Sequence, residues 1–543
     1  MAKSDDYPLS QQLHQTSEVA MQPATEKTSE ITTENNEQFA TGGRLALIMC
    51  AVLLAMFLVA LDRTIIATAV PRIANQFHAL DDISWYASAY LLTSCATQLL
   101  WGRLYTFYST KMVFLDAILI FEVGSALCGG APSSNAFIVG RAIAGVGSAG
   151  IFSGTTVIIA QVVPLQKRPI YVGLMGSIFG ISSIIGPLMG GAFTDHVTWR
   201  WCFYINLPIG GATLLVLLLF LRVPHKAEPC SLSRQLIRLD PLGTVLFLPG
   251  VICFLLTLQW GGVTYPWNNG HIIALFVVAG VLLIAFGAVQ IWRQEDATIP
   301  PRIFCQRSII SGTVFAFCLG GGLITMLYTL PLWFQAVKNV SAVKSGIDTI
   351  PMVLSLVVGS ILSGGIITAT GYYVPWMFVA TVLMSVGAGM TTTFRDDTGH
   401  AAWIGYQVLF GLGLGSGLQQ PSLAAQTVLG EKDVPIGISL MFFSQSLGGA
   451  LFICIAQSLF TNYLSSDLPN VSGINPVAVL SAGATELSKV VPPDKLDAVL
   501  VVYNEGLKRS FTVTVAVACL MVLPALTMEW RTIEKDKGSG AVA

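Results

Sequence analysis

The chain has 543 residues, of which 53% are apolar and only 11% are charged, and its formal net charge is −1. Because soluble domains carry about 25% charged residues, this composition excludes a protein whose main solvent is water. A net charge near zero provides no basic face for nucleic acid. The ten cysteines include no Cys-x-x-Cys pair and indicate neither a disulfide framework nor a metal site. We therefore expect no metal, no cofactor and no nucleic-acid partner.

Residues 1–43 form a polar segment rich in Ser, Thr, Glu and Gln. Such a segment cannot bury enough apolar area to offset the entropy lost on ordering, so we expect a disordered cytoplasmic tail. It does not read as a signal peptide, because the apolar run begins only after Arg44. The first helix is therefore expected to stay in the membrane.

Apolar runs long enough to cross a bilayer, about 20 residues each, recur along the rest of the chain and predict an all-α membrane protein. Fourteen runs are found, and the seventh and fourteenth are the least distinct, which leaves twelve or thirteen as alternatives. The predicted spans are residues 45–66, 84–104, 112–130, 136–157, 170–192, 202–221, 242–260, 272–292, 309–329, 346–368, 374–394, 401–421, 436–458 and 510–529.

The distribution of Lys and Arg orients these spans. With both termini in the cytoplasm, most of the 29 basic residues fall in cytoplasmic loops and tails, as the positive-inside rule requires. Two Asn-x-Ser sequons, at Asn339 and Asn470, then lie in external loops, and we expect N-glycosylation there.

Ionisable residues occur at membrane depth in the first, third and fourth spans. Asp62, near the end of the first span, either reaches the interface or marks an ion or proton route. Arg141 precedes Gly145 and other small residues that let helices approach closely, which would bury its side chain. A buried guanidinium needs a partner, and Asp62 and Glu122 are the candidates by residue type.

The fifth span carries Gly180 and then Gly186-Pro187-Leu-Met-Gly190-Gly191. These residues make a smooth helix face, which serves either plain packing or a helix shaped for sliding and occlusion. The sixth span opens with Trp199-Arg-Trp-Cys-Phe-Tyr-Ile-Asn-Leu-Pro-Ile-Gly210. Taken singly, its aromatic residues are ordinary interfacial anchors.

Four motifs occur in order: Asp62 near the end of the first span, Arg141 with Gly145 in the fourth, the Gly-Pro string of the fifth and the Trp-Arg-Trp string of the sixth. Together they resemble the major facilitator superfamily, and within it the fungal fourteen-span drug:proton antiporters and toxin efflux pumps. The resemblance covers residues 44–530 and implies two pseudo-symmetric six-helix bundles with two inserted helices (6+2+6). The loop after the second span departs from the family pattern. Gly102 and Lys111 match, but Thr106 and Phe107 stand at the acid and Arg positions, so the cytoplasmic latch formed by those charges is in doubt.

Weak sequence similarity between the two halves supports this division, because Gly145 and Gly147 align with Gly411 and Gly413. Transporters of this kind are built from such repeats. The expected units are a tail (1–43), an N-terminal bundle (44–221), the inserted pair (222–307), a C-terminal bundle (308–530) with an external loop (459–509), and a second cytoplasmic tail (531–543).

The expected function is export of small organic molecules. No ATP-binding signature is present, so an ion gradient must supply the energy, and the resemblance implies proton antiport with Asp62 or Glu122 titrating beside Arg141. In the C-terminal half the polar residues are mostly uncharged, which suits bulky, weakly polar substrates such as a fungal secondary metabolite, toxin or drug. The candidate cavity residues there are Gln335, Gln407, Gln419 and Gln445.

The alternative is an uptake or vacuolar permease for amino acids, siderophores or sugars. An enzyme is not expected, because all six histidines fall in loops or the tail. The expected partners are the substrate, protons and the lipid bilayer. The family resemblance implies a monomer, and the plasma membrane is the expected location, with the vacuolar membrane as the alternative.

Overall fold

The computed structural model describes residues 42–79, 82–222, 238–262, 264–471, 474–476, 479 and 487–533. All but Gly42 and Gly43 of the predicted N-terminal tail, and most of the predicted C-terminal tail, lie outside the described residues.

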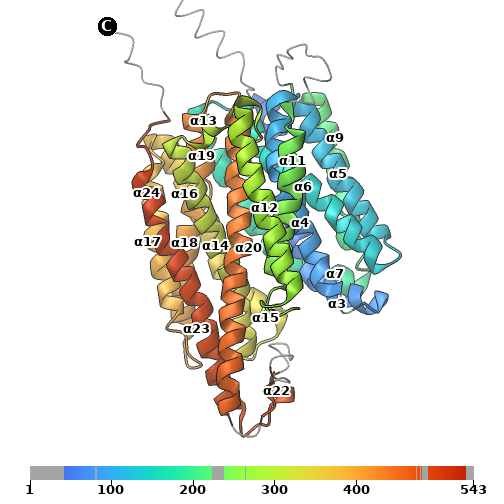
Figure 1. Cartoon of the computed structure of the whole chain (residues 1–543), viewed down its shortest axis with the longest axis vertical. Helices are drawn as coiled ribbons and strands as arrows, with labels where there is room; N and C mark the ends of the chain where they lie inside the picture. Colours follow the sequence, from blue (N-terminus) through green and yellow to red (C-terminus); the bar gives the residue numbers. More distant parts are fainter. Residues whose placement is uncertain are drawn as a thin grey trace, which may run out of the picture.

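Long helices occupy the predicted spans (Figure 1). The first six are α3 (Gly42–Phe77), α4 (Ile83–Phe107), α5 (Thr110–Gly130), α6 (Ser134–Val162), α7 (Arg168–His196) and α9 (Asn206–Phe220), the last preceded by α8 (Trp201–Tyr204). The inserted pair is α11 (Pro241–Trp260) and α12 (Gly270–Arg293). The last six are α14 (Arg307–Ala336), α16 (Ile350–Thr370), α17 (Val374–Thr391), α18 (His400–Gly417), α20 (Val434–Asp467) and α23 (Leu496–Leu520). Short helices α13 (Pro301–Phe304), α15 (Ala342–Asp348), α19 (Gln420–Val428), α22 (Leu487–Val490) and α24 (Val522–Thr527) join or extend them.

Thirteen helices among the described residues are long and apolar enough to cross a membrane. The fourteenth is α4, which has 25 residues and the length of a span but is less apolar than the others. The seventh predicted span is α11, and the fourteenth corresponds to the end of α23 and to α24. Since α20 continues to Asp467 and α23 begins at Leu496, the predicted external loop 459–509 is helical at both ends, and these helices project beyond their neighbours (Figure 1).

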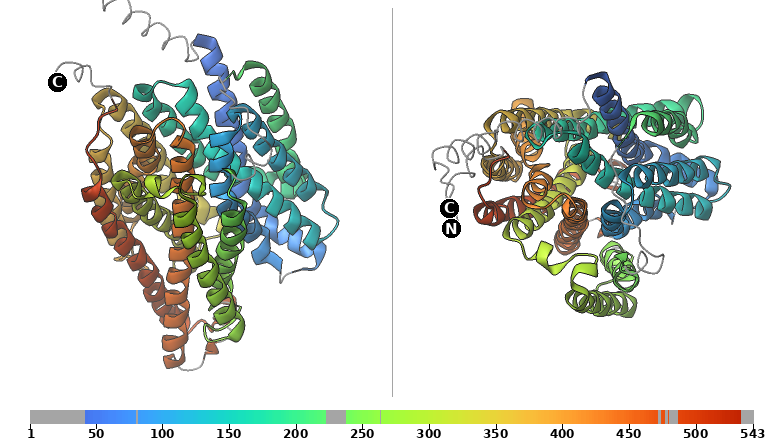
Figure 2. Two further views of the ribbon diagram at one scale, coloured as in Figure 1. Left: turned by 45° about the horizontal axis from the view of Figure 1, so that its top comes forward. Right: turned by 90° about the horizontal axis from the view of Figure 1, so that it is seen from above.

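The two sets of six helices pair in the same order. In the first set, α3 packs against α7 and α9, α4 and α5 each pack against α6, and α5 packs against α9. In the second set, α14 packs against α20 and α23, α16 and α17 each pack against α18, and α17 packs against α23. The predicted pair of pseudo-symmetric bundles is confirmed, and the view from above shows them side by side (Figure 2).

The inserted helices lie at the edge of the groove between the bundles (Figure 2). Helices α11 and α12 pack against each other, and α11 also contacts α4 of the first bundle and α20 of the second. The rings of Phe247 in α11 and Phe443 in α20 lie in contact at a tilted angle, with centroids 5.3 Å apart. The 6+2+6 arrangement is therefore also confirmed, and α11 contacts both bundles.

Small residues hold α6 against its neighbours. A Cβ atom on Gly147 would collide with the backbone of α5 at Ala117 and Phe121, and a Cβ on Gly145 would collide with the backbone of α4 at Tyr90. Close backbone approach of this kind is how membrane helices gain packing energy without a hydrophobic driving force between them.

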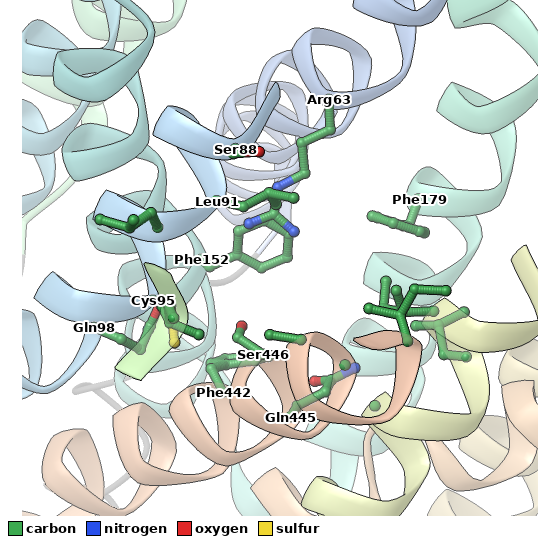
Figure 3. A pocket seen from close by; sticks show the side chains of 18 of the residues that line it. Arg63, Ser88, Leu91, Cys95, Gln98, Phe152, Phe179, Phe442, Gln445 and Ser446 are labelled. Atoms are coloured by element: carbon green, nitrogen blue, oxygen red, sulfur yellow. The ribbon is translucent and has the colours of Figure 1, made fainter. Parts of the chain in front are cut away.

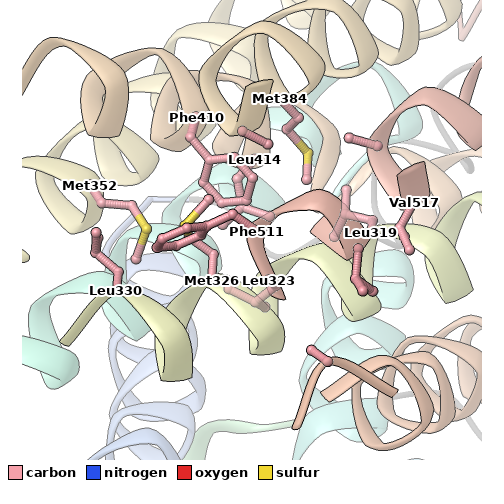
Figure 4. Close-up of a cluster of buried hydrophobic side chains, with 14 of the residues drawn as sticks. Leu319, Leu323, Met326, Leu330, Met352, Met384, Phe410, Leu414, Phe511 and Val517 are labelled. Atoms are coloured by element: carbon pink, nitrogen blue, oxygen red, sulfur yellow. The ribbon is translucent and has the colours of Figure 1, made fainter. Parts of the chain in front are cut away.

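The C-terminal bundle is held by large apolar side chains that interlock at its centre (Figure 4). Met326, Met352 and Met384 meet Phe410 and Phe511 there, and all five are at most 1% exposed. Methionine is flexible enough to fill irregular gaps between rings, so this bundle forms one continuous core.

The bundles meet along two seams at the end where α3 begins and the described C-terminus lies. At one seam a Cβ on Gly102 of α4 would touch Ser439 of α20, whose hydroxyl lies 3.1 Å from that of Ser153. At the other, Ser360 of α16 donates a hydrogen bond of 2.9 Å to the carbonyl of Gly173 in α7. Both seams include small residues that let the helices approach closely, and they join the two bundles at this end.

Replacing Gly147 by Ala should destabilise the protein, because the added methyl group meets the α5 backbone. Overpacking of this kind costs about 1–3 kcal/mol, so the melting temperature of the purified protein should fall by several degrees. The matched control is Gly211→Ala on α9, where a Cβ meets no atom within 4 Å. Equal melting temperatures for the two variants would contradict the close packing of α5 and α6.

Candidate functional site

A cavity of about 340 Å³ lies between the two bundles. It is lined by α3, α4, α6 and α7 on one side and by α14, α20 and the α18–α19 junction on the other (Figure 3). Phe152, Phe179 and Phe442 give it aromatic walls. Its lining extends from the seams toward the opposite end of the groove, at Ser88 and Gln457. A pocket of this size and character suits a small organic molecule.

The structure places two of the four predicted cavity glutamines at this cavity. Gln419 and Gln445 line it. Gln407 is buried elsewhere and donates a hydrogen bond of 3.0 Å to the carbonyl of Asp348. Gln335 donates one of 2.9 Å to the hydroxyl of Ser345. The last two glutamines therefore hold the short helix α15 in place and do not line the cavity.

The inserted helix α11 also lines the cavity, which the sequence does not indicate. Leu255, Leu258 and Gln259 face it, and the Gln259 amide donates a hydrogen bond of 2.5 Å to the Ser88 hydroxyl of α4. Helix α11 thus closes the gap between α4 and α20 on one side. Its sequence is almost uniformly apolar, so no periodic face signals this role.

Arg63 is a second cavity residue that sequence reasoning did not single out. Its side chain reaches from α3 into the cavity (Figure 3). Its guanidinium carbon lies 4.9 Å from the ring centre of Phe152, and its Nη2 donates a hydrogen bond of 3.3 Å to Ser94. Its position next to Asp62 could have indicated this role. Adjacent residues of a helix face different directions, so Asp62 can face the bundle interior while Arg63 faces the cavity.

Asp62 and Arg141 form the buried ion pair that the residue types predict. Arg141 Nη1 lies 2.5 Å from Asp62 Oδ2, and both side chains are at most 1% exposed. Arg141 Nε also donates a hydrogen bond of 2.9 Å to the carbonyl of Tyr86, and the guanidinium lies 4.4 Å from the ring centre of Tyr90. Such a pair is favourable in an apolar interior only when its remaining polar atoms are satisfied. The bond to Tyr86 satisfies Nε of Arg141, whereas Oδ1 of Asp62 is buried without a hydrogen-bond partner among the described residues.

Glu122, the other candidate partner for Arg141, lies apart from this pair. Its carboxylate faces Gly210 of α9, where a Cβ would collide with it. Among the described residues neither carboxylate oxygen has a hydrogen-bond partner, although the side chain is only 7% exposed. An unpartnered charge is costly at membrane depth, and the neutral acid costs less.

Comparison with known proteins decides the family. The sequence model described as Major Facilitator Superfamily matches residues 52–453. The chain is 56% identical over 501 residues to a rubrofusarin-specific efflux pump of Gibberella zeae, covering 92% of each protein. It is 51% identical over 501 residues to an efflux pump of Aspergillus parasiticus, covering 92% of this chain and 98% of that pump. The chain belongs to the major facilitator superfamily.

Solved structures of this superfamily share the fold. The human organic anion transporter MFSD10 superposes with a TM-score of 0.58 at 14% identity, covering 90% of this chain and 100% of that one. The proton:xylose symporter XylE gives a TM-score of 0.55 at 14% identity, covering 89% and 94%. Since the relatives are transporters, the chain is a membrane transporter and not an enzyme.

The glycines of the superfamily motif in α7 divide between two partners. Gly180 faces Val357 of α16 across the two bundles, whereas Gly186 and Gly190 face the threonines of α3 at Thr64 and Thr68. A Cβ on Gly191 would meet no atom within 4 Å, and Pro187 lies inside an unbroken helix. One helix face therefore makes contacts both within its bundle and between bundles.

The superfamily's usual charged latch after the second span is replaced here by contacts from the inserted pair. Among the described residues, Lys111 donates a hydrogen bond to a carbonyl of its own bundle, that of Leu218, at 2.5 Å. Arg103 of α4 is 1% exposed and donates to the carbonyls of Arg238 and Asp296 in the linkers that flank α11 and α12. The first bundle is thereby tied to the linkers of the insertion.

The same linkers are tied to the second bundle through Arg302. Its guanidinium makes two hydrogen bonds to the carboxylate of Asp433, of 2.6 and 3.0 Å, at the start of α20. It also bonds Glu295, at 2.7 Å. The hydrogen bonds to Asp433, and then those to Glu295, raise the pKa of Arg302 above its usual value. The predicted loss of the family latch is therefore accompanied by another set of contacts at the same end.

Asp240 organises the linker at the start of α11. Its carboxylate accepts hydrogen bonds from the backbone N–H of Gly243, the amide of Gln290, and both the N–H and the hydroxyl of Thr298. Burial alone would raise the pKa of Asp240, but these hydrogen bonds outweigh it and hold that pKa below its usual value. Asp240 therefore stays charged at neutral pH.

The two sequon asparagines lie where a sugar could be attached. Asn339 follows α14 and Asn470 follows α20, both side chains are exposed, and both helices end away from the closed seams. The second sequon includes Ser472, which lies outside the described residues. N-glycosylation stays a prediction.

Removing one partner of the Asp62–Arg141 pair should destabilise the protein more than removing both. Asp62→Asn leaves a buried uncompensated charge, which costs about 3–5 kcal/mol, whereas Asp62→Asn with Arg141→Gln leaves neutral side chains. Melting temperatures of the purified variants check this double-mutant cycle. Asp195→Asn, at an exposed position on α7, is the control. Strictly additive losses would contradict the pairing.

Proposed function

We propose that this transporter exports a small organic molecule in exchange for protons. The observation that carries the proposal is the placement of an aromatic cavity beside ionisable groups at membrane depth. Arg63 lines the cavity, its neighbour Asp62 is paired with Arg141, and Glu122 is buried without a partner. Ionisable residues at membrane depth mark proton and substrate routes.

The seams support an outward-facing state, which importers and exporters both pass through, so export is proposed on the precedent of the relatives. With both termini in the cytoplasm, Gly102, Gly173 and Ser360 close the cytoplasmic end, and the cavity reaches toward the outside. This is the outward-facing state, in which an exporter releases its substrate and takes up a proton. Efflux by the relatives from Gibberella zeae and Aspergillus parasiticus supports the same direction.

The proton is assigned to Glu122 in this state. Asp62 is already neutralised by Arg141, whereas the Glu122 carboxylate has no cationic or hydrogen-bonding partner among the described residues. Protonation removes the cost of that charge. In this proposal the ion pair between Asp62 and Arg141 forms and breaks as the two bundles move relative to each other.

The substrate class is a secondary metabolite or toxin, on the precedent of the rubrofusarin-specific relative, with foreign drugs of similar size as further substrates. The proposed location is the plasma membrane, and the proposed functional unit is the monomer, since the cavity is built from one chain.

Cells of a pump-deficient yeast that express the chain should lose preloaded lipophilic dyes and fungal aromatic metabolites faster than control cells. A protonophore should abolish the difference, because the proton gradient supplies the energy. Export that persists with the protonophore would contradict proton coupling. Faster accumulation of these compounds would contradict export.

Glu122→Gln should reduce gradient-driven export to the level of cells without the protein, because the amide cannot take up a proton. Exchange of labelled substrate across vesicles without a gradient should persist, since the cavity is intact. Asp62→Asn should also abolish gradient-driven export while leaving membrane insertion intact. Asp195→Asn is the matched control and should export normally. Normal export by Glu122→Gln would contradict the assignment of the proton to Glu122, and normal export by Asp62→Asn would contradict a coupling role for Asp62.

A further inference from the structure

Arg63 is a cation at the cavity without an anionic partner. Among the described residues that line the cavity, none is acidic, and no described acidic side chain forms an ion pair with Arg63. The contrast with Arg141 is direct, since that guanidinium is matched by Asp62. Arg141 is therefore matched by an acid, whereas the half-buried Arg63 faces the substrate space.

The contacts of Arg63 leave most of its donors open. A guanidinium has five N–H donors, and Arg63 uses one of them, from Nη2 to the hydroxyl of Ser94 at 3.3 Å. Its Nε is buried without a hydrogen-bond partner. The group is flanked by the rings of Phe152 and Tyr90, whose centres lie 4.9 and 5.5 Å from its Cζ. The guanidinium therefore lies beside two aromatic rings, and its Nη1 makes no hydrogen bond among the described residues.

The rest of the cavity suits a planar molecule. Phe152, Phe179 and Phe442 provide aromatic surfaces, and the amide of Gln445 lies on the wall opposite Arg63 (Figure 3). Planar, bidentate recognition of a carboxylate or similar oxyanion is what a guanidinium does best.

We propose that Arg63 is the anion-binding residue of the cavity, and that the molecules this transporter carries are planar aromatic compounds bearing an ionised carboxylate, enolate or phenolate. This inference rests on the proposed function and adds to it the charge of the substrate. It also predicts that planar cations of the same size are poor ligands, because Arg63 repels them and no acidic side chain compensates.

The test is binding to the purified full-length protein in lipid nanodiscs, at neutral pH and without any gradient. The probes are anthracene-2-carboxylate, the isosteric neutral anthracene-2-carboxamide, and the planar cation 9-aminoacridine, each followed by its own fluorescence. The carboxylate should bind about tenfold more tightly than the carboxamide, as expected for hydrogen bonds to a charged group. The cation should bind more weakly than either.

Arg63→Gln should bring the affinity of the carboxylate down to that of the carboxamide and leave carboxamide binding unchanged. Arg63→Lys, which keeps the charge but loses the planar fork, should retain part of the preference. The matched control is Arg72→Gln, at an exposed position on the same helix outside the cavity, and it should bind like the unaltered chain.

Equal affinity for carboxylate and carboxamide in the unaltered chain would overturn the inference, and so would a preference that survives Arg63→Gln. The comparison of probes in the unaltered chain does not depend on any variant folding. Anion preference without gradient-driven export in cells would overturn the proposed function alone. Gradient-driven export without anion preference would overturn this inference alone.

Discussion

A charge placed at membrane depth must find its partner within the protein, and the first bundle is arranged around this constraint. The Asp62–Arg141 pair joins α3 to α6, and Tyr86 of α4 accepts the next donor of the same guanidinium. These contacts require α6 to lie close to its neighbours, which its glycines allow. The ion pair and the close packing of α6 therefore depend on each other. The same pair is also a candidate for coupling proton movement to transport.

Small residues also occur where the two bundles are in contact. The described seams between α4 and α20 and between α7 and α16 include glycine and serine, and α20 also buries Ile438 and Phe442 against the first bundle. The C-terminal bundle interlocks internally through methionine and phenylalanine. Because each half has its own core, the halves are suited to move as rigid bodies. The linker contacts through Arg103 and Arg302 add polar bonds at the closed end.

The membrane spans and the need for an acidic partner could be predicted, because both depend on the composition of a single stretch of sequence. The spans follow from their apolar runs. The cost of an unpaired charge predicts an acidic partner for Arg141, with Asp62 and Glu122 as candidates, and the structure shows that the partner is Asp62. The cavity lining does not follow, because it depends on which face each helix turns inward. Gln419 and Gln445 line it while Gln335 and Gln407 do not, although all four look alike in the sequence. The part played by α11 and the contacts of Arg103 depend on segments far apart in the chain.

Helix α4 carries the polar residues that face the cavity and the seam, among them Ser88, Gln98 and Arg103, and it is the one long helix in the described part of the chain that falls short of a typical span in hydropathy. During synthesis at the ribosome such a segment partitions poorly from the translocon into lipid by itself. Its polar groups gain partners only once α6 and α11 are present. Stable insertion of α4 must therefore await later segments, so that a chain truncated before them should be a preferred substrate for quality-control proteolysis.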